Sequence, residues 1–396
     1  MITHFHVRNY KALRDVKLDL TPIHVLIGPN DSGKTSILDA IAALCRSVDH
    51  PLAQAFTGSW EGRSLVWRGE PDLDVSFTAT VENGQLDFNY KLSCGFRPLG
   101  RDPKVQEENL SFGSESQRVE FSSTGHHLTR VCGIEAQGRA ATSEERDAVR
   151  QVHDALVGIH DYRWIPRFLA LPVALDAKRG CRMEPSGFGL AQSLDGILSD
   201  DRNQFIKLEE RFREVFPHIK SIKLRAANAY RAPTDDPEQI PILNRADGKG
   251  IYFEFTSGGQ VVSASQVSDG VLLILAYLTV LYLPQPPRVV LVEEPENGIH
   301  PKRLQDVLRI LRDLVKEQAH TQVILTTHSP YVVDLFEPNE VTLCQMEKDG
   351  SVSVCPLSKS KTVREQLDVF TLGEIWTAEG DEALARSSAP EEDEEQ

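Results

Sequence analysis

The sequence has few cysteines, no long apolar run and no internal repeat. Its six cysteines lie far apart and form no C-x-x-C pair, which excludes a small disulfide scaffold. The longest apolar run, residues 271–283, has about 13 residues and is too short to span a bilayer, so it predicts a buried helix. No sustained heptad pattern is present, which argues against long coiled-coil arms. The N-terminal residues alternate polar and apolar instead of forming a secretory leader, so we expect a reduced, cytoplasmic protein without a membrane segment.

Positive charge is also scarce, but the deficit is uneven. The chain has 43 Lys and Arg against 58 Asp and Glu, a net charge of −15. Residues 379–396 hold eight acidic side chains and one arginine, so they carry −7 and leave −8 on the other 378 residues. Residues 160–231 hold 13 basic and 9 acidic side chains, a local charge of +4, with aromatic residues between them. Nucleic acid therefore remains open as a partner, although scattered solvated charges explain the segment equally well.

Hydrophobic periodicity predicts strands that alternate with helices, which is typical of a parallel α/β sheet. An antiparallel β insert is expected between residues 64 and 132, with a turn at Asn83-Gly84. Residues 143–216 are helical in character, and residues 251–265 return to strands. The remaining predicted elements are three short strands within residues 2–27, a helix from Gly33, a helix from Val271, a strand at 289–292, an amphipathic helix with Pro301 in its first turn and a strand at 322–326.

Residues 28–35 read G-P-N-D-S-G-K-T and match the phosphate-binding pattern G-x-x-x-x-G-K-[ST] between a predicted strand and a predicted helix. The glycines let backbone N–H groups wrap a phosphate, and the helix N-terminus adds its positive dipole end. Lys34 is expected to reach the β- and γ-phosphates, and the Thr35 hydroxyl to bind Mg²⁺. Asp31 stands where such loops often have glycine, and aspartate tolerates the left-handed conformation better than most residues. The predicted ATP-binding residues here are Gly28, Pro29, Asn30, Asp31, Ser32, Gly33, Lys34, Thr35 and Ser36.

Two further predicted strands end in polar residues at the edge where nucleotides bind in open α/β sheets. The strand R-V-V-L-V ends in Glu293 and Glu294, which point to opposite sides because they are adjacent. We assign Glu293 to Mg²⁺ or its bound water, and Glu294 to polarising the attacking water. The strand Q-V-I-L-T-T ends at His328, whose imidazole can hydrogen-bond the γ-phosphate.

Two segments compete as a third phosphate contact. Residues 257–260 read S-G-G-Q, the letters of the transporter signature, but they lie between two alternating segments and predict a hairpin turn. Residues 267–270, V-S-D-G, stand directly before the apolar helix, where free N–H groups can bind phosphate. We therefore choose Ser268 and Gly270 and treat 257–260 as a decoy.

With these residues in place, the chain resembles the ABC-type ATPase heads of the RecF, OLD and SMC group. The matching stretches are F-H-V-R-N-Y-K-A-L-R-D, G-P-N-D-S-G-K-T, V-S-D-G, E-E-P-E-N-G-I-H-P, T-T-H-S-P and F-T-L-G-E-I-W. They cover roughly residues 1–48 and 250–378, about half the chain.

The resemblance implies Mg²⁺-dependent ATP hydrolysis by a head-to-head dimer that holds two ATP molecules. Gly28, Gly33, Lys34 and Thr35 of one subunit would face Ser268 and Gly270 of the other, and His328 would sense the γ-phosphate. Two departures stand out: Glu293 replaces the usual aspartate, and Asp269 and Val271 replace a glycine and a glutamine of the transporter signature. The glutamine of the Q-loop is not placed.

The implied architecture is an α/β ABC-type head with a mixed or parallel sheet, an antiparallel β insert and a helical lobe. Its expected parts are an N-terminal ATPase lobe (1–140), a helical or insert lobe (141–250), a C-terminal ATPase lobe (251–378) and an acidic, disordered tail (379–396). The partners we expect are a second copy or a higher homo-oligomer and a separate effector or nuclease, with DNA left open.

Four functions compete. The preferred one is an ATPase that regulates a separate effector in bacterial anti-phage defence. The alternative is a RecF-like DNA-binding repair ATPase. A transporter subunit is disfavoured, because Lys34 and Glu294 are 260 residues apart, about twice the spacing in those subunits. An OLD-type nuclease needs a D-x-D motif after the histidine strand, and the 68 residues after His328 contain none.

The sequence also predicts the register of two cysteines. A two-residue turn at Asp349-Gly350 would place Cys344 directly opposite Cys355, and in a reducing cytoplasm we expect both to remain thiols.

Overall fold

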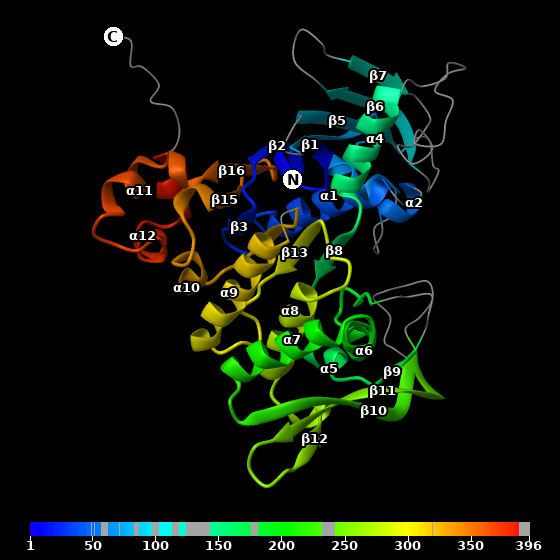
Figure 1. The fold of residues 1–396 in the computed structure, drawn as a ribbon. Coiled ribbons are helices and arrows are strands. Elements are labelled where there is room, and N and C mark those ends of the chain that lie inside the picture. Colours follow the sequence, from blue (N-terminus) through cyan, green and yellow to red (C-terminus); the bar gives the residue numbers. More distant parts are fainter. Residues whose placement is uncertain are drawn as a thin grey trace, which may run out of the picture. The chain divides into compact units, whose positions relative to one another are not determined.

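The computed structural model describes residues 1–396 except 49, 51, 57–61, 71, 83–86, 97–102, 113–118, 124–142, 176–180, 232–241, 319 and 388–396. It divides into two compact units. The first comprises residues 1–159, 288–291 and 322–396, and the second comprises residues 160–287 and 292–321. Figure 1 colours the chain from blue at the N-terminus to red at the C-terminus.

The first unit is built on antiparallel strands and on a mixed sheet. Its strands are β1 (Ile2–Tyr10), β2 (Leu13–Asp19), β3 (Ile23–Ile27), β4 (Val75–Glu82), β5 (Asp87–Gly95), β6 (Lys104–Phe112), β7 (Val119–Ser123), β14 (Gln322–Thr326), β15 (Val341–Met346) and β16 (Val352–Pro356). Its helices are α1 (Lys34–Ser47), α2 (Leu52–Ala55), α4 (Ser143–Leu156), α10 (Pro330–Val333), α11 (Lys361–Gln366), α12 (Leu372–Glu379) and α13 (Asp381–Arg386).

One sheet has the strand order β2-β1-β4-β5-β6-β7, and each pair of neighbouring strands in it is antiparallel. This confirms the predicted antiparallel β insert and shows that the insert continues the N-terminal hairpin. Glu82 pairs with Asp87, which confirms a hairpin here, although four residues separate the pair where a two-residue turn would pair Glu82 with Gln85. The predicted turn at Asn83-Gly84 lies outside the described residues. Helix α1 buries Ile37, Ile41 and other apolar residues at helical spacing in the same core.

The second sheet has the order β16-β15-β3-β14-β13-β8. Strand β3 pairs in parallel with β14 and with β15, while β15 and β16 form an antiparallel hairpin. Strands β8 (Ile159–Tyr162) and β13 (Val289–Glu293) each begin in the first unit and run into the second. The predicted mixed α/β fold is thereby confirmed.

The second unit combines helices with a long β ribbon. Its elements are α5 (Pro166–Leu169), β9 (Val173–Ala174), α6 (Leu190–Asp200), α7 (Arg202–Val215), β10 (Ile219–Arg231), β11 (Ile242–Phe255), β12 (Val261–Ser263), α8 (Asp269–Leu281) and α9 (Pro301–Glu317). Helix α8 is apolar on all sides and 11 of its 13 residues are buried, so the longest apolar run forms the core of this unit. No described helix has the length and apolar character needed to cross a membrane.

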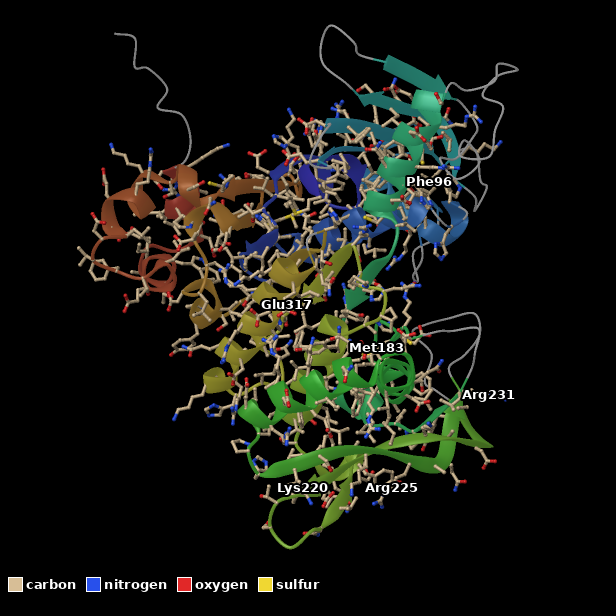
Figure 2. All side chains as sticks on the ribbon, in the orientation of Figure 1. Phe96, Met183, Lys220, Arg225, Arg231 and Glu317 are labelled. Carbon is tan, nitrogen blue, oxygen red and sulfur yellow. The ribbon has the colours of Figure 1, made fainter. Side chains whose placement is uncertain are left out.

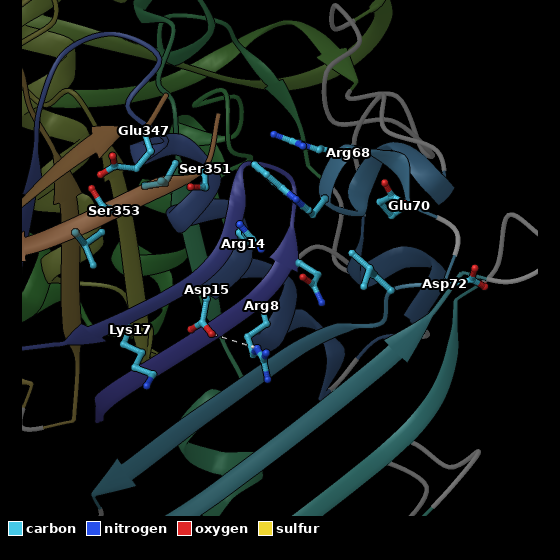
Figure 3. Close-up of a pocket in the computed structure, with 15 residues that line it drawn as sticks. Arg8, Arg14, Asp15, Lys17, Arg68, Glu70, Asp72, Glu347, Ser351 and Ser353 are labelled. Atoms are coloured by element: carbon cyan, nitrogen blue, oxygen red, sulfur yellow. Dashed lines mark ion pairs between the residues drawn. The ribbon is translucent and has the colours of Figure 1, made fainter. Parts of the chain in front are cut away.

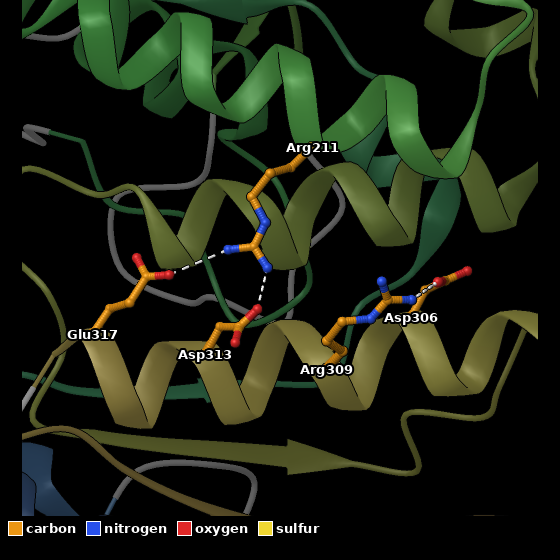
Figure 4. A network of polar contacts seen from close by, with 5 residues as sticks. All are labelled: Arg211, Asp306, Arg309, Asp313 and Glu317. Atoms are coloured by element: carbon orange, nitrogen blue, oxygen red, sulfur yellow. Dashed lines mark hydrogen bonds and ion pairs between the residues drawn. The ribbon is translucent and has the colours of Figure 1, made fainter.

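Helices α7 and α9 are joined by a polar network (Figure 4). The Arg211 guanidinium of α7 donates to the Asp313 carboxylate of α9 and lies 3.4 Å from Glu317 Oε1. Burial by itself lowers the pKa of Arg211, but hydrogen bonds to Asp313 and to Tyr282 outweigh it and raise that pKa overall, so Arg211 stays charged. Asp313 and Glu317 are four residues apart on α9 and therefore lie on the same face of the helix. One guanidinium can reach both carboxylates for this reason.

Three expectations need correction. Residues 143–216 are not purely helical, because they contain β8 and β9. The predicted tail begins too early: residues 381–386 form α13, where Leu384 is fully buried and Asp381 accepts a hydrogen bond from Trp376 Nε1 at 2.7 Å. Residues 388–396 lie outside the described residues.

The cysteine register is also different from the prediction. The Glu347 amide donates to the Ser351 carbonyl, so the β15–β16 turn has three residues, with Gly350 at φ 82°. This extra residue pairs Cys344 with Val354 and places Cys355 opposite Leu343. A shift by one residue turns a side chain to the other face of a strand, so the two thiols do not face each other.

Candidate functional site

The loop between β3 and α1 depends on two glycines. Gly28 has φ 138°, and a Cβ there would lie 2.2 Å from the Cys344 carbonyl oxygen. Gly33 has φ 86°, and its Cβ would lie 2.3 Å from Val352 Cγ2. Asp31 has φ 64°, which confirms that aspartate takes the left-handed position predicted for it. The backbone therefore needs glycine at both ends of the loop, for conformation and for space.

Lys34 is held inside the curve of this loop. Its side chain is buried, and Nζ donates to the Gly28 carbonyl at 2.9 Å, to the Pro29 carbonyl at 2.7 Å and to Ser32 Oγ at 3.2 Å. The ammonium group is thus fixed among oxygen atoms at the start of α1. A phosphate in the loop would meet this charge directly, since the neighbouring backbone already curves around it.

The N-terminus of α1 supplies the second phosphate-binding feature. The helix starts at Lys34, and its N-cap Gly33 has no side chain to cap the first N–H groups. Thr35, Pro29 and Asn30 are exposed, whereas Ser32 is buried. The uncapped N–H groups and the dipole of the helix favour an anion at this end, and the Thr35 side chain lies where solvent can reach it.

The end of β14 lies beside the start of this loop. Thr326 pairs with Leu26 in the parallel register, and the Thr327 amide donates to the Leu26 carbonyl at 3.1 Å. Thr327 Oγ1 accepts a hydrogen bond from the Ser329 amide at 3.0 Å and so shapes the turn that carries the half-buried His328. The structure therefore brings His328 and the phosphate-binding loop to the same edge of the sheet in the first unit.

The predicted acid pair belongs to the second unit and ends β13. Residues 289–292 are buried, Glu293 is half-buried, and Glu294 has φ 45°, which is uncommon for a residue with a side chain. A strained backbone conformation of this kind persists only where the surrounding packing maintains it. Such conformations are concentrated at functional sites. Although the sequence predicted that the two acids point to opposite sides, Glu293 and Glu294 both line one cavity.

Each of the two carboxylates has a neighbour that the sequence did not indicate. Arg163 Nη2 lies 2.5 Å from Glu293 Oε1, and Asn297 Nδ2 donates to Glu294 Oε2 at 2.6 Å. Asn297 could have been found from its spacing, since it is three residues after Glu294 in a tight turn whose amide also bonds the Glu294 carbonyl. Arg163 is 130 residues from Glu293 in sequence, and no local pattern points to it.

A cavity of about 180 Å³ lies between these groups, within the second unit. Its aromatic wall is formed by Tyr162, Trp164 and Tyr277, with ring centroids 4.7 and 4.5 Å apart in that order. Burial raises the pKa of Tyr162 and of Tyr277, so both phenols stay neutral. Glu293, Glu294 and Arg163 are the charged residues that line this cavity.

The start of α8 is as predicted. Ser268 is the N-cap in an extended conformation, its hydroxyl makes no capping hydrogen bond, and Ser268 and Asp269 are exposed. A Cβ on Gly270 would lie 3.7 Å from the nearest atom, the Gly298 carbonyl oxygen, which is an ordinary contact. Packing within this chain therefore does not require glycine at 270, whereas close approach of a ligand would.

The competing S-G-G-Q segment forms a turn, as predicted. Glu254 pairs with Val261 across β11 and β12, and the Phe255 amide donates to the Gln260 carbonyl at 2.9 Å. Gly258 and Gly259 both have positive φ and no neighbour within 4 Å of an added Cβ. No helix begins there, so the segment lacks the N–H groups that bind phosphate.

A wide cleft of about 1130 Å³ also opens in the first unit (Figure 3). The cleft adjoins the loop through Val352. This side chain lines the cleft and packs against Gly33, so closely that a Cβ on Gly33 would clash with it. Arg68 has φ 52°, lies over the Trp67 ring and donates to the Asp349 carbonyl at 2.5 Å. The cleft beside this loop is lined by four basic side chains and four carboxylates: Arg8, Arg14, Lys17, Arg68, Asp15, Glu70, Asp72 and Glu347.

Two family models match the chain. The first is described as "AAA domain, putative AbiEii toxin, Type IV TA system" and matches residues 159–334, and the second is described as "AAA ATPase domain" and matches residues 1–120.

Three curated relatives are similar in sequence. The OLD nuclease of Thermus scotoductus is 21% identical over 89% of this chain, which spans only 64% of that relative. The ATP/GTP phosphatase of Helicobacter pylori is 20% identical, over 85% of this chain and 88% of that protein. The DNA replication and repair protein RecF of Acaryochloris marina is 31% identical over 31% of each.

Among solved structures, an SMC head bound to the C-winged helix domain of ScpA covers 89% of this chain and 97% of its own, with a TM-score of 0.48 and 17% identity. The SMC head domain from Thermotoga maritima covers 90% and 98%, with a TM-score of 0.41 and 13% identity.

Proposed function

We propose that this chain, which is an ATPase head of the RecF, OLD and SMC group, closes on ATP as a head-to-head dimer and so regulates a separate effector. The observation that carries the proposal is the loop before α1. There Lys34, two indispensable glycines and an uncapped helix N-terminus converge beside His328. This arrangement supports an anion site at the sheet edge where nucleotides bind in α/β folds.

In this proposal the loop binds the phosphates of ATP and the adjoining cleft receives the rest of the nucleotide. Backbone N–H groups within residues 30–36 and Lys34 Nζ contact the β- and γ-phosphates. The Arg68 guanidinium, which lies over the buried Trp67 ring, is the place for the base, since a guanidinium stacks on planar rings.

Mg²⁺ would be held by the Thr35 hydroxyl and by Glu293, together with phosphate oxygens. These are hard oxygen donors, which fit the preference of Mg²⁺. When bound, the ion neutralises charge that develops on the transferring phosphoryl group. The chain's own contribution is to expose Thr35 at the start of α1 and to fix the Glu293 side chain against Arg163.

For hydrolysis, Glu294 would orient and polarise the attacking water, and His328 would hydrogen-bond the γ-phosphate. The Asn297 amide donates to one Glu294 oxygen at 2.6 Å and so orients the carboxylate. Ser268 and Gly270 would contact the γ-phosphate bound by the second copy, because Gly270 has no packing role in its own chain. Such an arrangement makes hydrolysis dependent on dimerisation.

Glu294→Gln tests this proposal. The amide keeps the shape of the side chain but cannot polarise water, so we expect phosphate release to fall by at least about 100-fold. ATP affinity should be unchanged, and light scattering should show more dimer with ATP than in the wild type.

Lys34→Ala should lose ATP binding. Normal turnover by Glu294→Gln would refute the role of Glu294, and unchanged ATP affinity in Lys34→Ala would refute the loop as the phosphate site.

The effector is the less direct half of the proposal. Its support is the similarity to an OLD nuclease, of which this chain spans 64%. We propose anti-phage defence as the setting by analogy with ATPases of this kind that act with a partner. Genes beside the coding sequence test it: a nuclease or another effector is expected, and a membrane permease would contradict it.

DNA binding is the second candidate, and the ribbon of β10 and β11 favours it (Figure 2). Lys220, Arg225 and Arg231 are exposed on β10, and the Arg225 guanidinium lies 5.6 Å from the Tyr252 ring centroid. However, Lys220 and Lys223 both bond Glu254 and hold the pKa of that carboxyl down to about 2. Glu254 therefore competes with any phosphate for these two lysines.

Anisotropy of a labelled DNA duplex tests this candidate. Glu254→Gln should strengthen binding and Arg225→Glu should weaken it, and affinity should fall steeply with salt. A wild-type ATPase that neither binds DNA nor is stimulated by it would exclude the RecF-like alternative.

A further inference from the structure

Large apolar side chains are exposed close together in sequence near the C-terminus of the first unit. Among the described residues, eight large hydrophobic side chains are exposed. Four of them lie on α10 and on the segment between α11 and α12. We call these four residues the C-terminal patch: Tyr331 (69% exposed), Leu367 (39%), Val369 (76%) and Phe370 (51%). The other four are isolated from one another in sequence, so half of all such exposure is concentrated here.

Helices α10 and α12 hold the two parts of the patch together. The Gly373 amide donates to Asp334 Oδ1 at 2.7 Å. A Cβ on Gly373 would lie 2.4 Å from the Pro330 carbonyl oxygen, so the start of α12 packs directly on the start of α10. Tyr331 follows Pro330, and Phe370 precedes Gly373 by three residues. The close contact therefore brings Tyr331 and the 367–370 segment to neighbouring positions.

The segment that carries Leu367, Val369 and Phe370 is an ordered turn. The Val369 and Phe370 amides both donate to the Gln366 carbonyl at 3.0 Å, and the Leu367 amide donates to Val363 at the same distance. Thr371 and Glu374 then form a capping box at the start of α12. The apolar side chains are thus presented by a fixed backbone, which lowers the entropy lost on binding.

Acidic residues surround this patch. Glu365, Asp368 and Glu374 are exposed and lie within four residues of it in sequence. Residues 361–387, the described part of the C-terminus, contain six acidic and three basic side chains, a net charge of −3. The apolar residues therefore lie in a negatively charged part of the described chain.

From this combination we propose that the C-terminal patch is the docking surface for a positively charged segment of a separate protein, one with apolar anchor residues between lysines or arginines. The apolar residues give the contact area, and the acidic surround selects the charge of the partner. A second copy of the patch is disfavoured as its occupant because like charges would face each other. DNA and anionic lipid are disfavoured for the same reason. The identification of that partner as the effector rests on the proposed function.

Two synthetic peptides of 18 residues test the proposal. One has leucine at helical spacing with lysine elsewhere, and the other has glutamate in place of every lysine. Binding of the labelled peptides to the full chain is followed by anisotropy. The lysine peptide should bind and weaken with salt, and the glutamate peptide should not bind. The double variant Val369→Asp, Phe370→Asp should weaken the lysine peptide by about ten-fold or more, as expected for loss of central apolar contacts.

The matched control is Ile206→Asp, which changes an apolar residue of similar exposure (40%) on α7 and should leave peptide binding unchanged. Tyr331→Ser provides a second, independent variant if the double variant fails to fold. Equal loss of binding in the control, no loss in either patch variant, or equal binding of the glutamate peptide would overturn the proposal. A halved molecular mass of the patch variants in light scattering would identify a second copy as the occupant, and would overturn it too.

The same preparations separate this inference from the proposed function. The substituted residues lie outside the ATP site, so ATP hydrolysis should be unchanged in every variant. A wild type without ATP hydrolysis but with patch-dependent peptide binding would refute the proposed function and leave the docking surface standing. ATP hydrolysis without patch-dependent peptide binding would refute the docking surface and leave the proposed function standing.

Discussion

The ion pair between Arg163 and Glu293 predicts how Mg²⁺ dependence should respond to one substitution. Arg163 Nη2 lies 2.5 Å from the carboxylate that we assign to the metal. Mg²⁺ must therefore compete with the guanidinium for Glu293. Replacing Arg163 with alanine removes the competitor, so less Mg²⁺ should be needed for half-maximal ATP hydrolysis.

The size of the effect follows from the exposure of the pair. The Glu293 side chain is 20% exposed and the Arg163 side chain 56%, so solvent screens much of their attraction. Pairs of this kind contribute about 0.2–1 kcal/mol, which corresponds to a reduction of about 1.4- to 5-fold in the Mg²⁺ concentration at half-maximal rate. Phosphate release measured over a Mg²⁺ series at saturating ATP gives this value directly.

A second variant separates the effect of the Arg163–Glu293 contact from the effect of removing one positive charge nearby. Arg167→Ala removes the same charge four residues away, where the guanidinium lies over the Phe168 ring, 5.0 Å from its centroid. We expect it to change the Mg²⁺ requirement less than Arg163→Ala does. Arg163→Lys keeps the charge without the planar fork and should be intermediate. An unchanged or increased Mg²⁺ requirement in Arg163→Ala would refute the competition.

Three further predictions concern the loop, the start of α8 and the C-terminus. Gly28→Ala would place Cβ 2.2 Å from a backbone oxygen that cannot rotate away, so ATP affinity measured by titration calorimetry should fall by at least about ten-fold, and wild-type affinity would refute the loop geometry. Ser268→Arg should block hydrolysis while Ser257→Arg, in an open turn, should be mild; the reverse result in a phosphate-release assay would mean that the turn is the signature. Deleting 388–396 should leave hydrolysis and the melting temperature intact, whereas deleting 380–396 removes the buried Leu384 and should cost about 2–4 kcal/mol in denaturant unfolding. Equal stability of the two truncations would show that α13 does not support the fold.

Much of the candidate site could be predicted because its signals are local. The spacing of Gly28, Gly33 and Lys34, the N-cap at Ser268 and the acids at the end of β13 each need only a strand, a loop and a helix in sequence. The choice between Ser257 and Ser268 also followed from local pattern, since one segment lies between strands and the other before a helix.

The register of β15 and β16 shows where a local prediction fails. Whether the turn has two or three residues decides which side chains face each other, and both lengths fit the letters K-D-G-S. The prediction of the residue at which the tail begins was wrong for a similar reason. Acidic composition suggested disorder from residue 379, but one buried leucine and the hydrogen bond from Trp376 to Asp381 stabilise α13.

The sequence by itself determined the α/β class, the phosphate-binding loop and the strand ends that carry the acids and His328. These features depend on residues within one or two elements, where periodicity and turn chemistry act directly. Only the tertiary structure decided that Arg163 contacts Glu293, that Val352 closes over Gly33 and that α10 and α12 assemble one apolar patch. Those pairings join residues 39 to 319 positions apart, and they depend on how whole elements pack, which no local pattern encodes.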